Sequence, residues 1–263
     1  MDLIKEFDRL FKGEAIPMPT VFSFDTIPST NTAAREYFEK NNPTGGTYLF
    51  FSRSQSAGRG TRGRSFESPE GGLYLSLLFT ERLFPEDLQR ITVAAAVAVC
   101  KTLNRLFPNL GAKIKWVNDI TVSDRKISGI LAESALADGG QAKYIILGIG
   151  INISGGHYSP EVEKIKTSLA ENNLSISPES LCAEITHALL SMRGTDWSDI
   201  ISSYRKDSAL IGRHVKILRT QGSISATATA INEDGTLVCR LESGESFTLS
   251  SGDVSVRADN TYQ

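Results

Sequence analysis

Cysteine is scarce in this chain, and its three copies share no pattern. Cys100, Cys182 and Cys239 are odd in number, lie far apart and form no CxxC pair. They exclude a disulfide framework and a cysteine-based metal site, and they are typical of a reducing compartment such as the cytoplasm. The three histidines are isolated as well, without the spacing of metal ligands.

Long apolar runs are also missing. The longest, residues 91–100, is interrupted at Thr92 and has only about half the length of a membrane span. Residues 1–14 are charged and amphipathic, and they lack the apolar core of a signal peptide. We therefore expect a soluble cytoplasmic protein with no membrane partner.

The chain has no excess of charge of either sign. Its 28 Lys and Arg residues stand against 30 Asp and Glu residues, which gives a net charge of −2. This balance excludes a basic field over the whole protein, so we expect no DNA partner. Any site for an anion must be local.

What the chain does contain is the composition of a globular protein, with 40% hydrophobic and 22% charged residues. Hydrophobic periodicity predicts helices over residues 2–12, 30–40, 86–106, 177–192 and 197–206. It predicts strands over residues 21–25, 47–52, 73–79, 112–116, 119–122, 126–134 and 144–149, with a hairpin turn at 123–125.

The pattern changes near residue 210. Beyond that point we predict five short strands, over residues 215–218, 225–231, 237–241, 246–249 and 253–256. Short strands at this spacing indicate a small β-barrel. We therefore divide the chain into a large domain, residues 1–210, and a small domain, residues 211–263. Residues 1–20 form a helical extension of the large domain.

A loop rich in arginine and glycine follows the second predicted strand. Arg53, Arg59, Arg62 and Arg64 lie in it without a nearby acid before Glu67. Its glycines allow the backbone to approach a ligand or to adopt positive φ, and arginine side chains match phosphate and carboxylate oxygens. The loop fits either a clamp on a polyanion or a solvated surface loop.

Two phosphate-binding motifs fit this loop only in part. Its glycines satisfy GxGxxG, and they nearly satisfy the P-loop pattern with Arg64 in place of lysine. Both motifs need a helix directly after the loop, because the helix N-terminus receives the phosphates. Here SFESPEGG and a strand follow, so we reject both.

Other segments combine polar side chains with glycine. KWVND at residues 115–119 fits either a nucleotide contact or a simple turn. Lys126 fits a surface lysine or a charge aimed at an anion, and Gly129 indicates close approach of a ligand or backbone. GIGIN at residues 148–152 leaves one sheet face bare, which admits a flat ring or tight packing. Residues 29–31, STN, can cap a helix or bind a small polar ligand.

Taken in order, these segments resemble a biotin protein ligase. They are STN at 29–31, QSAGRGTRGR at 55–64, KWVND at 115–119, KISGILAE at 126–133 and GIGIN at 148–152. Each is weak alone, whereas all of them in this order are specific. DGTL at 234–237 and SGDVSVR at 251–257 resemble the small C-terminal barrel of that family.

The resemblance implies an α+β fold, in which a mixed sheet with helices is similar to the catalytic domain of class II aminoacyl-tRNA synthetases. An SH3-like C-terminal barrel would follow it. The implied reaction converts biotin and MgATP into biotinyl-5′-AMP and pyrophosphate. Biotin then passes to one lysine of a biotin carboxyl carrier domain, usually that of acetyl-CoA carboxylase. No tightly bound cofactor is expected, and a homodimer is one oligomeric state we consider.

The resemblance also assigns roles to residues. Lys126 and Arg59 would be catalytic, with Lys126 bridging the biotin carboxylate and the α-phosphate. Biotin would be bound by Ser29, Thr30, Asn31, Gln55, Gly58, Arg59, Gly60, Thr61, Lys126 and Gly129. ATP would be bound by Arg62, Arg64, Lys115, Trp116, Asn118, Asp119, Lys126 and Asn152, with Mg²⁺ at Asp119.

These roles make chemical sense, because an ionised carboxylate needs no general base to attack a phosphate. It needs charge neutralisation and alignment. We therefore expect Lys126→Ala to abolish adenylation and leave the fold intact. We expect Gly60→Val to disable the loop, because a β-branched residue resists positive φ.

The chain departs from the family at several points. Thr61 replaces an arginine common in bacterial members, which puts retention of the adenylate in doubt, and Val117 replaces a common proline. Because only 28 residues precede Ser29, we expect no N-terminal DNA-binding domain and no repressor function. The alternatives are a lipoate or octanoate ligase or transferase of the same fold, and a non-catalytic SH3-like binding module.

Overall fold

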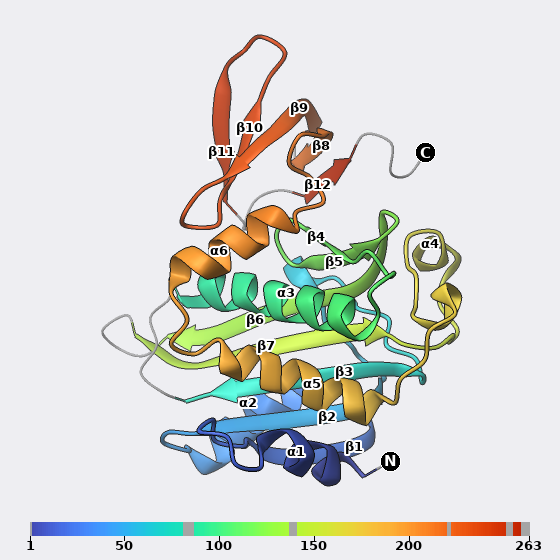
Figure 1. Ribbon diagram of the computed structural model, residues 1–263, viewed down its shortest axis with the longest axis vertical. Coiled ribbons are helices and arrows are strands. Elements are labelled where there is room, and N and C mark those ends of the chain that lie inside the picture. The colour runs from blue at the N-terminus through green and yellow to red at the C-terminus, as the bar shows by residue number, and fades with distance from the viewer. Residues whose placement is uncertain (1, 81–86, 137–140, 220–221, 251–254, 259–263) are drawn as a thin grey trace.

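The computed structural model describes residues 2–80, 87–136, 141–219, 222–250 and 255–258, arranged around one large and one small sheet (Figure 1). None of the described helices is both long and apolar enough to cross a membrane. Glu86, the predicted start of a helix, and residues 251–254 of the C-terminal motif lie outside the described residues.

The large sheet has seven strands in the order β1-β2-β3-β7-β6-β5-β4. They are β1 (Thr20–Ile27), β2 (Thr47–Gln55), β3 (Gly72–Phe79), β4 (Lys113–Lys115), β5 (Asp119–Val122), β6 (Arg125–Leu136) and β7 (Ala142–Asn152). β1 and β2 are parallel, and every other neighbouring pair is antiparallel. The predicted mixed sheet is confirmed.

The predicted hairpin turn between β5 and β6 is confirmed as well. Ser123 and Asp124 have φ of 48° and 63°, in the left-handed region. Two consecutive residues with positive φ match the right-handed twist of the strands they connect. This tight turn places β5 directly beside the start of β6.

Helices cover one face of the large sheet with a large hydrophobic core (Figure 1). α1 (Leu3–Phe11) packs on α5 (Pro178–Ser191), and α5 and α6 (Trp197–Lys206) both pack on α3 (Asp87–Leu106). The strands contribute alternate residues to this core, such as Leu75 of β3 and Ile149 of β7. Short helical turns lie in the connecting segments: η1 (Thr61–Gly63), α4 (Pro160–Glu163) and η2 (Ala170–Asn172).

The opposite face, which we call the α2 face, is covered by a helix only in part. α2 (Thr30–Asn41) begins at its cap Ser29 and packs on β2, β3 and β7. A small apolar cluster lies beneath it, formed by Ala34, Phe50, Leu78, Tyr144 and Ile146. Beyond Ile146 the α2-face positions of β7 are Gly148 and Gly150. At Gly148 the first turn of α2 contributes only the Asn31 amide, which occupies the place of a Cβ atom, and the site begins there.

The small sheet has five strands in the order β11-β10-β9-β8-β12. They are β8 (His214–Arg219), β9 (Gly222–Ile231), β10 (Leu237–Arg240), β11 (Ser246–Leu249) and β12 (Ser255–Ala258). The turn between β9 and β10 contacts the large sheet, because the carbonyl of Gly235 accepts a hydrogen bond from Nε1 of Trp116 at 2.9 Å. The division into two domains near residue 210 stays a prediction.

Candidate active site

Strand register creates a row of small and polar residues across the α2 face. Gly129 of β6 pairs with Gly150 of β7, Gly150 with Tyr74 of β3, and Gly129 with Asp119 of β5. A Cβ atom at Gly150 would lie 2.5 Å from the ring of Phe66. The bare face predicted from the glycines therefore receives a flat ring, and that ring belongs to Phe66.

A cavity of about 480 Å³ lies over this row. It is lined by 16 of the predicted site residues: Ser29, Thr30, Asn31, Gln55, Arg59, Gly60, Thr61, Arg62, Arg64, Lys115, Trp116, Asn118, Asp119, Lys126, Gly129 and Asn152. These residues come from segments spread over more than 120 positions of the chain. The structure thus brings every predicted site residue except Gly58 to one place.

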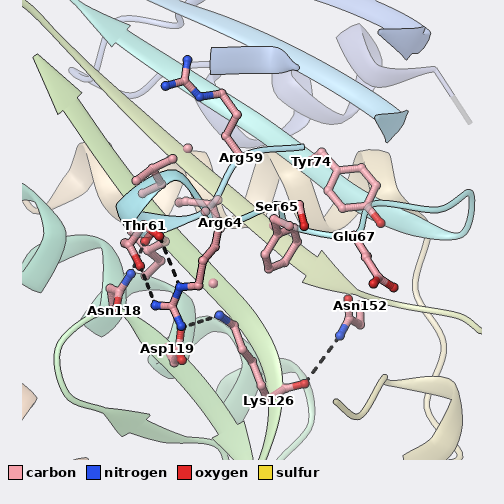
Figure 2. Close-up of a pocket in the computed structure, with 18 of the residues that line it drawn as sticks. Arg59, Thr61, Arg64, Ser65, Glu67, Tyr74, Asn118, Asp119, Lys126 and Asn152 are labelled. Atoms are coloured by element: carbon pink, nitrogen blue, oxygen red, sulfur yellow. Dashed lines mark hydrogen bonds and ion pairs between the residues drawn. The ribbon is translucent and has the colours of Figure 1, made fainter. Parts of the chain in front are cut away.

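A lysine lies at one end of the cavity (Figure 2). The Nζ atom of Lys126 is 2.6 Å from a carboxylate oxygen of Asp119, and it lies 5.4 Å from the centroid of the Phe66 ring. A Cβ atom at Gly129 would approach this Nζ to 2.9 Å. The absence of a side chain at Gly129 therefore leaves room for the Lys126 side chain to lie along β6. Asp119 holds the ammonium group in this position.

Amides and hydroxyls form the other end of the cavity. Gln55 Oε1 accepts hydrogen bonds from the backbone N–H and the hydroxyl of Thr30, at 2.8 and 3.1 Å. Asn31 Nδ2 donates to Glu133 at 2.7 Å, and the hydroxyl of Ser76 donates to Asn31 Oδ1 at 2.5 Å. Because a carboxylate only accepts, Glu133 fixes which way the Asn31 amide points.

The arginine loop lies over the cavity with its side chains in two directions. Arg64 folds back onto Thr61, donating to its hydroxyl at 3.1 Å and to its carbonyl at 3.3 Å. Arg59 forms an ion pair with Glu133 at 2.8 Å, and Figure 2 shows it pointing away from Lys126. In this structure Arg59 thus lies at the amide end of the cavity, whereas Lys126, the other residue expected to be catalytic, lies at the opposite end.

One expectation about the loop glycines is wrong, and another of these glycines lies outside the cavity. Gly60 does not have positive φ; its φ is −118°, and the left-handed positions are Arg62 and Gly63, with φ of 62° and 70°. Gly58 does not line the cavity. A Cβ atom at Gly58 would lie 2.2 Å from the carbonyl oxygen of Phe66, so close packing of the loop on itself explains this glycine.

Side chains predicted to bind ATP also hold the site together. Asn118 donates to the carbonyl of Ile130 at 2.6 Å, and Asn152 donates to that of Thr167 at 3.0 Å. Trp116 is bound to the small sheet through Gly235, as described above. Amides with a structural partner retain further hydrogen-bonding capacity, so these contacts do not by themselves exclude a ligand.

Sequence reasoning missed several residues that line or support the cavity. Phe66 and Tyr74 contribute aromatic rings, and Tyr158 donates a hydrogen bond to Asn152 at 3.2 Å. Burial raises the pKa of the Tyr74 and Tyr158 hydroxyls, so both are protonated at neutral pH. Glu133 had a detectable signal, because a carboxylate in an otherwise apolar strand needs a partner. The aromatic residues had none, because only strand register and loop packing bring them here.

Metal-binding groups are sparse in the described part of the chain. No cluster of three or more His, Cys, Asp or Glu side chains there could hold a metal ion. Asp119 contributes one carboxylate, and Lys126 contacts it. A lone carboxylate fits a Mg²⁺ ion that arrives with nucleotide phosphates better than a resident ion.

Comparison with known families gives matches to two parts of the chain. Residues 23–152 match the Biotin/lipoate A/B protein ligase family. Residues 210–257 match the Biotin protein ligase C terminal domain. Together these matches extend over more than half of the chain, and they include every motif on which the resemblance was based.

Individual relatives agree with the family matches. The bifunctional ligase/repressor BirA of Bacillus spizizenii is 29% identical over 84% of this chain and 69% of its own length. BirA of Bacillus subtilis is 33% identical, and the match spans 56% of this chain and 45% of the relative. The biotin–[acetyl-CoA-carboxylase] ligase of Mycobacterium tuberculosis is 26% identical over 78% of this chain and 77% of its own length.

A solved structure agrees with the fold over nearly the whole chain. The biotin protein ligase of Aquifex aeolicus in complex with biotin and ATP superposes with a TM-score of 0.74 and 23% identity, covering 91% of this chain and 99% of the other. At that identity the likeness establishes the architecture.

Proposed function

The chain belongs to the biotin protein ligase family, and from this premise we propose that it joins biotin to a lysine of a carboxylase carrier domain in two ATP-dependent steps. In the first step a carboxylate oxygen of biotin attacks the α-phosphate of ATP. The bond between that phosphorus and pyrophosphate breaks, giving biotinyl-5′-AMP. In the second step the amine of the acceptor lysine attacks the acyl carbon, AMP leaves, and the amine loses a proton.

One observation carries this proposal: the cavity has two chemically different ends over the row of glycines. Thr30, Asn31 and Gln55 supply amides and hydroxyls at one end, and Lys126 supplies a cation at the other. Biotin has the same polarity, with a cyclic urea at one end, an aliphatic chain, and a carboxylate at the other end. We therefore place the urea at the amide end and the carboxylate near Lys126.

Lys126 has the central role in the first step. Biotin carboxylate and the α-phosphate are both anions, so their approach requires a positive charge between them. The Nζ atom of Lys126 lies 2.6 Å from a carboxylate oxygen of Asp119, and the Lys126 side chain is only 30% exposed. A charge held in place before the reaction avoids reorganisation during it. No general base is required, which agrees with the protonated state of Tyr74 and Tyr158.

The nucleotide would extend from Lys126 over the arginine loop and the KWVND segment. Arg62 and Arg64 of the loop, and Lys115 beside Asp119, all line the cavity and supply positive charge for phosphates. Mg²⁺ arriving with ATP would add further charge neutralisation, with Asp119 as its protein ligand. Asn152 would contact the adenine. Arg59 would act at the urea end, where it pairs with Glu133, the carboxylate that orients Asn31.

The experiment is exchange of labelled pyrophosphate into ATP, with biotin, lipoate, octanoate or no acid. The proposal predicts exchange that depends on biotin, because reversal of adenylation returns pyrophosphate to ATP. Exchange with lipoate or octanoate alone would move the protein to a different acid within the same fold. Absence of exchange with every acid would contradict the adenylating function and favour a binding module.

A second assay addresses transfer. The wild-type protein is incubated with biotin, MgATP and a purified biotin carboxyl carrier domain, and the mass of the carrier is measured. The proposal predicts the addition of one biotinyl group at one lysine. A carrier variant in which that lysine is replaced by arginine is the matched control, and modification of the control would contradict a specific transfer.

A further inference from the structure

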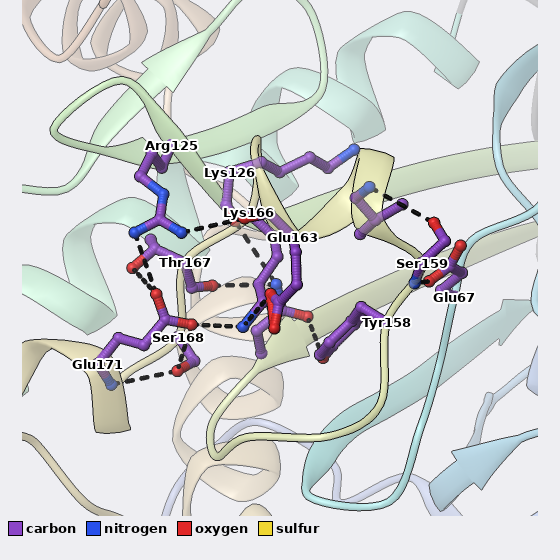
Figure 3. Close-up of polar contacts among 12 residues, drawn as sticks. Glu67, Arg125, Lys126, Tyr158, Ser159, Glu163, Lys166, Thr167, Ser168 and Glu171 are labelled. Atoms are coloured by element: carbon purple, nitrogen blue, oxygen red, sulfur yellow. Dashed lines mark hydrogen bonds and ion pairs between the residues drawn. The ribbon is translucent and has the colours of Figure 1, made fainter.

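A cluster of charges lies on the segment that follows β7, and its lysine, Lys166, is buried at the edge of the cavity that it helps to line (Figure 3). Lys166 is only 5% exposed, and its ammonium group contacts the carboxylates of Glu163, at 2.9 Å, and Glu171. It also lies 4.8 Å from the centroid of the Tyr158 ring. Burial alone would lower the pKa of Lys166, but the bonds to Glu171 and Glu163 raise it, so the side chain stays charged.

The backbone of the same segment pairs with Lys126. The N–H of Lys126 donates to the carbonyl of Ile165 at 2.8 Å, and the carbonyl of Lys126 accepts from the N–H of Thr167 at 2.8 Å. Lys166 is the residue between these two partners, and it forms a parallel bridge with Lys126. The buried cation and the cavity lysine thus stand at paired positions of two adjacent extended segments.

Residues 165–167 pair with β6 beyond the point where β7 stops being its neighbour. The last β6–β7 pair on this side is Ser128 with Ile151. Two residues earlier, at Lys126, residues 165–167 lie beside β6 in place of β7. On its β7 side the Lys126 backbone is therefore held by a connecting segment, whereas on the other side it pairs with Thr121 of β5.

Stability alone does not explain a cation in this place. Burying an ammonium group costs desolvation even when exposed carboxylates pair with it, and well-packed apolar side chains often stabilise a fold equally well. A buried ammonium group does restrict conformation, because a shift of the segment away from Glu163 and Glu171 would leave it unpaired away from water. Arg125, at the start of β6, extends this restriction, since its guanidinium contacts Glu171 at 3.1 Å and the carbonyl of Glu163 at 3.1 Å.

We propose that Lys166, held by Glu163 and Glu171, is a positioning residue for Lys126. It fixes residues 165–167, which in turn fix the backbone from which Lys126 extends into the cavity. The inference rests on the proposed function, in which Lys126 lies between two reacting anions. A displacement of a reacting group by about 1 Å can cost about 10²-fold in rate, so fixing this backbone has a measurable consequence.

The test compares Lys166→Met with Lys164→Met in the full-length protein. Methionine has a similar length and no charge, and Lys164 is an exposed lysine of the same segment. Adenylate formation is measured in a single turnover with saturating biotin and MgATP. We expect the rate constant of Lys166→Met to fall about 10- to 100-fold with an unchanged amplitude. Lys164→Met should match the wild type, and Lys166→Arg should regain most of the rate.

Backbone hydrogen exchange gives a readout that does not depend on turnover. In Lys166→Met the amides of Lys126 and Thr167 should exchange faster than in the wild type. Ile130 lies in β6 like Lys126, and its N–H donates to the carbonyl of Asn118 at 2.9 Å. The exchange rate of this amide should be unchanged. A general loss of stability would raise exchange at all three positions, and that result would overturn the proposal.

The other outcomes are also decisive. A wild-type rate constant in Lys166→Met overturns the inference, and so does a reduced amplitude with a normal rate constant, because that pattern means misfolded protein. If Lys166→Met does not fold, Glu171→Gln takes its place, and a normal rate there overturns the inference. If the wild type forms no adenylate, the proposed function fails and the exchange data alone decide on positioning.

Discussion

The α2 face of the large sheet has two halves that differ in the size of their side chains. In the covered half, Phe50, Leu78 and Ile146 are large and buried, and α2 packs on them. In the glycine half, Gly129, Gly148 and Gly150 present no side chain to the same face. The strands continue through both halves without interruption.

This comparison shows how one sheet provides both a core and a site. Large side chains fill the space above the sheet and attract a helix, because burying apolar area is favourable. Glycines leave that space to Phe66, Lys126 and the residues of a cavity. Along β7 the change takes only two residues, from Ile146 to Gly148, or about 7 Å of strand.

The largest effect we predict concerns the charge over the glycine half. Lys126→Ala should lower the rate of biotin-dependent pyrophosphate exchange by about 10²- to 10³-fold, because the reacting anions lose their shared cation. The fold should persist, as judged by circular dichroism. Lys143→Ala, an exposed lysine on β7 beside the covered half, is the control. An equal loss of exchange rate in Lys126→Ala and Lys143→Ala would contradict the difference between the two halves.

The next effect concerns the amide end, where the two halves meet. Glu133→Gln replaces an acceptor-only carboxylate by an amide that can also donate, so the side chain no longer fixes the Asn31 amide, and it removes the ion pair with Arg59. Hydrogen bonds to a charged group contribute about 1.5–3 kcal/mol, so biotin affinity should fall about tenfold or more in calorimetry. Glu39→Gln, at an exposed position of α2, should bind like the wild type. An unchanged affinity in Glu133→Gln would mean that Asn31 needs no orientation.

A smaller effect of the opposite kind is expected in the covered half. Ile146→Val removes one buried methyl group and should cost about 0.5–1.5 kcal/mol in the free energy of unfolding. Biotin affinity should not change, because Ile146 packs under α2 and does not line the cavity. Urea denaturation and calorimetry measure the two quantities. A loss of affinity without a loss of stability would reverse the roles of the two halves.

The smallest effect concerns the contact between the sheets, at the hairpin that follows β5. Arg213 lowers the pKa of Asp124 through two hydrogen bonds, at 2.6 and 3.0 Å. The pair therefore stabilises the fold above the unfolded pKa of about 3.9, and this stabilisation disappears as the pH falls through the lowered pKa. Because both side chains are more than a third exposed, we expect at most about 1 kcal/mol.

The measurement for this pair is the unfolding free energy of wild type and Asp124→Asn against pH. The wild type should be the more stable of the two at neutral pH, and the difference should shrink as the medium becomes acidic. A difference that stays constant or grows toward low pH would exclude the carboxylate as its source.

Local signals predicted much of the fold. Hydrophobic periodicity predicted α6 over the residues that form it, and the turn residues before β6 predicted the hairpin. These features depend on neighbours in sequence. The family resemblance, based on ordered motifs, predicted the mixed sheet and named most residues that line the cavity.

Non-local packing was not predictable in the same way. Nothing local to Gly129 or Gly150 shows that they are cross-strand partners, because register is set by the whole sheet. For the same reason the sequence did not show that Phe66 lies on them. Gly60 and Gly63 have different φ angles because of the way the loop folds, and the sequence does not show which of the two glycines has positive φ. Lys166 stood in no motif.

The most direct test of the account is the biotin dissociation constant of Gly150→Val, measured by calorimetry. A side chain at this position would enter the space of Phe66 in the glycine half, since even its Cβ atom would lie 2.5 Å from that ring. Overpacking of this kind costs about 1–3 kcal/mol, so we predict about 10- to 100-fold weaker binding, with Ile146→Val as the control that binds normally. Wild-type affinity in Gly150→Val would contradict the claim that Gly150 leaves the space from which Phe66 shapes the ligand site.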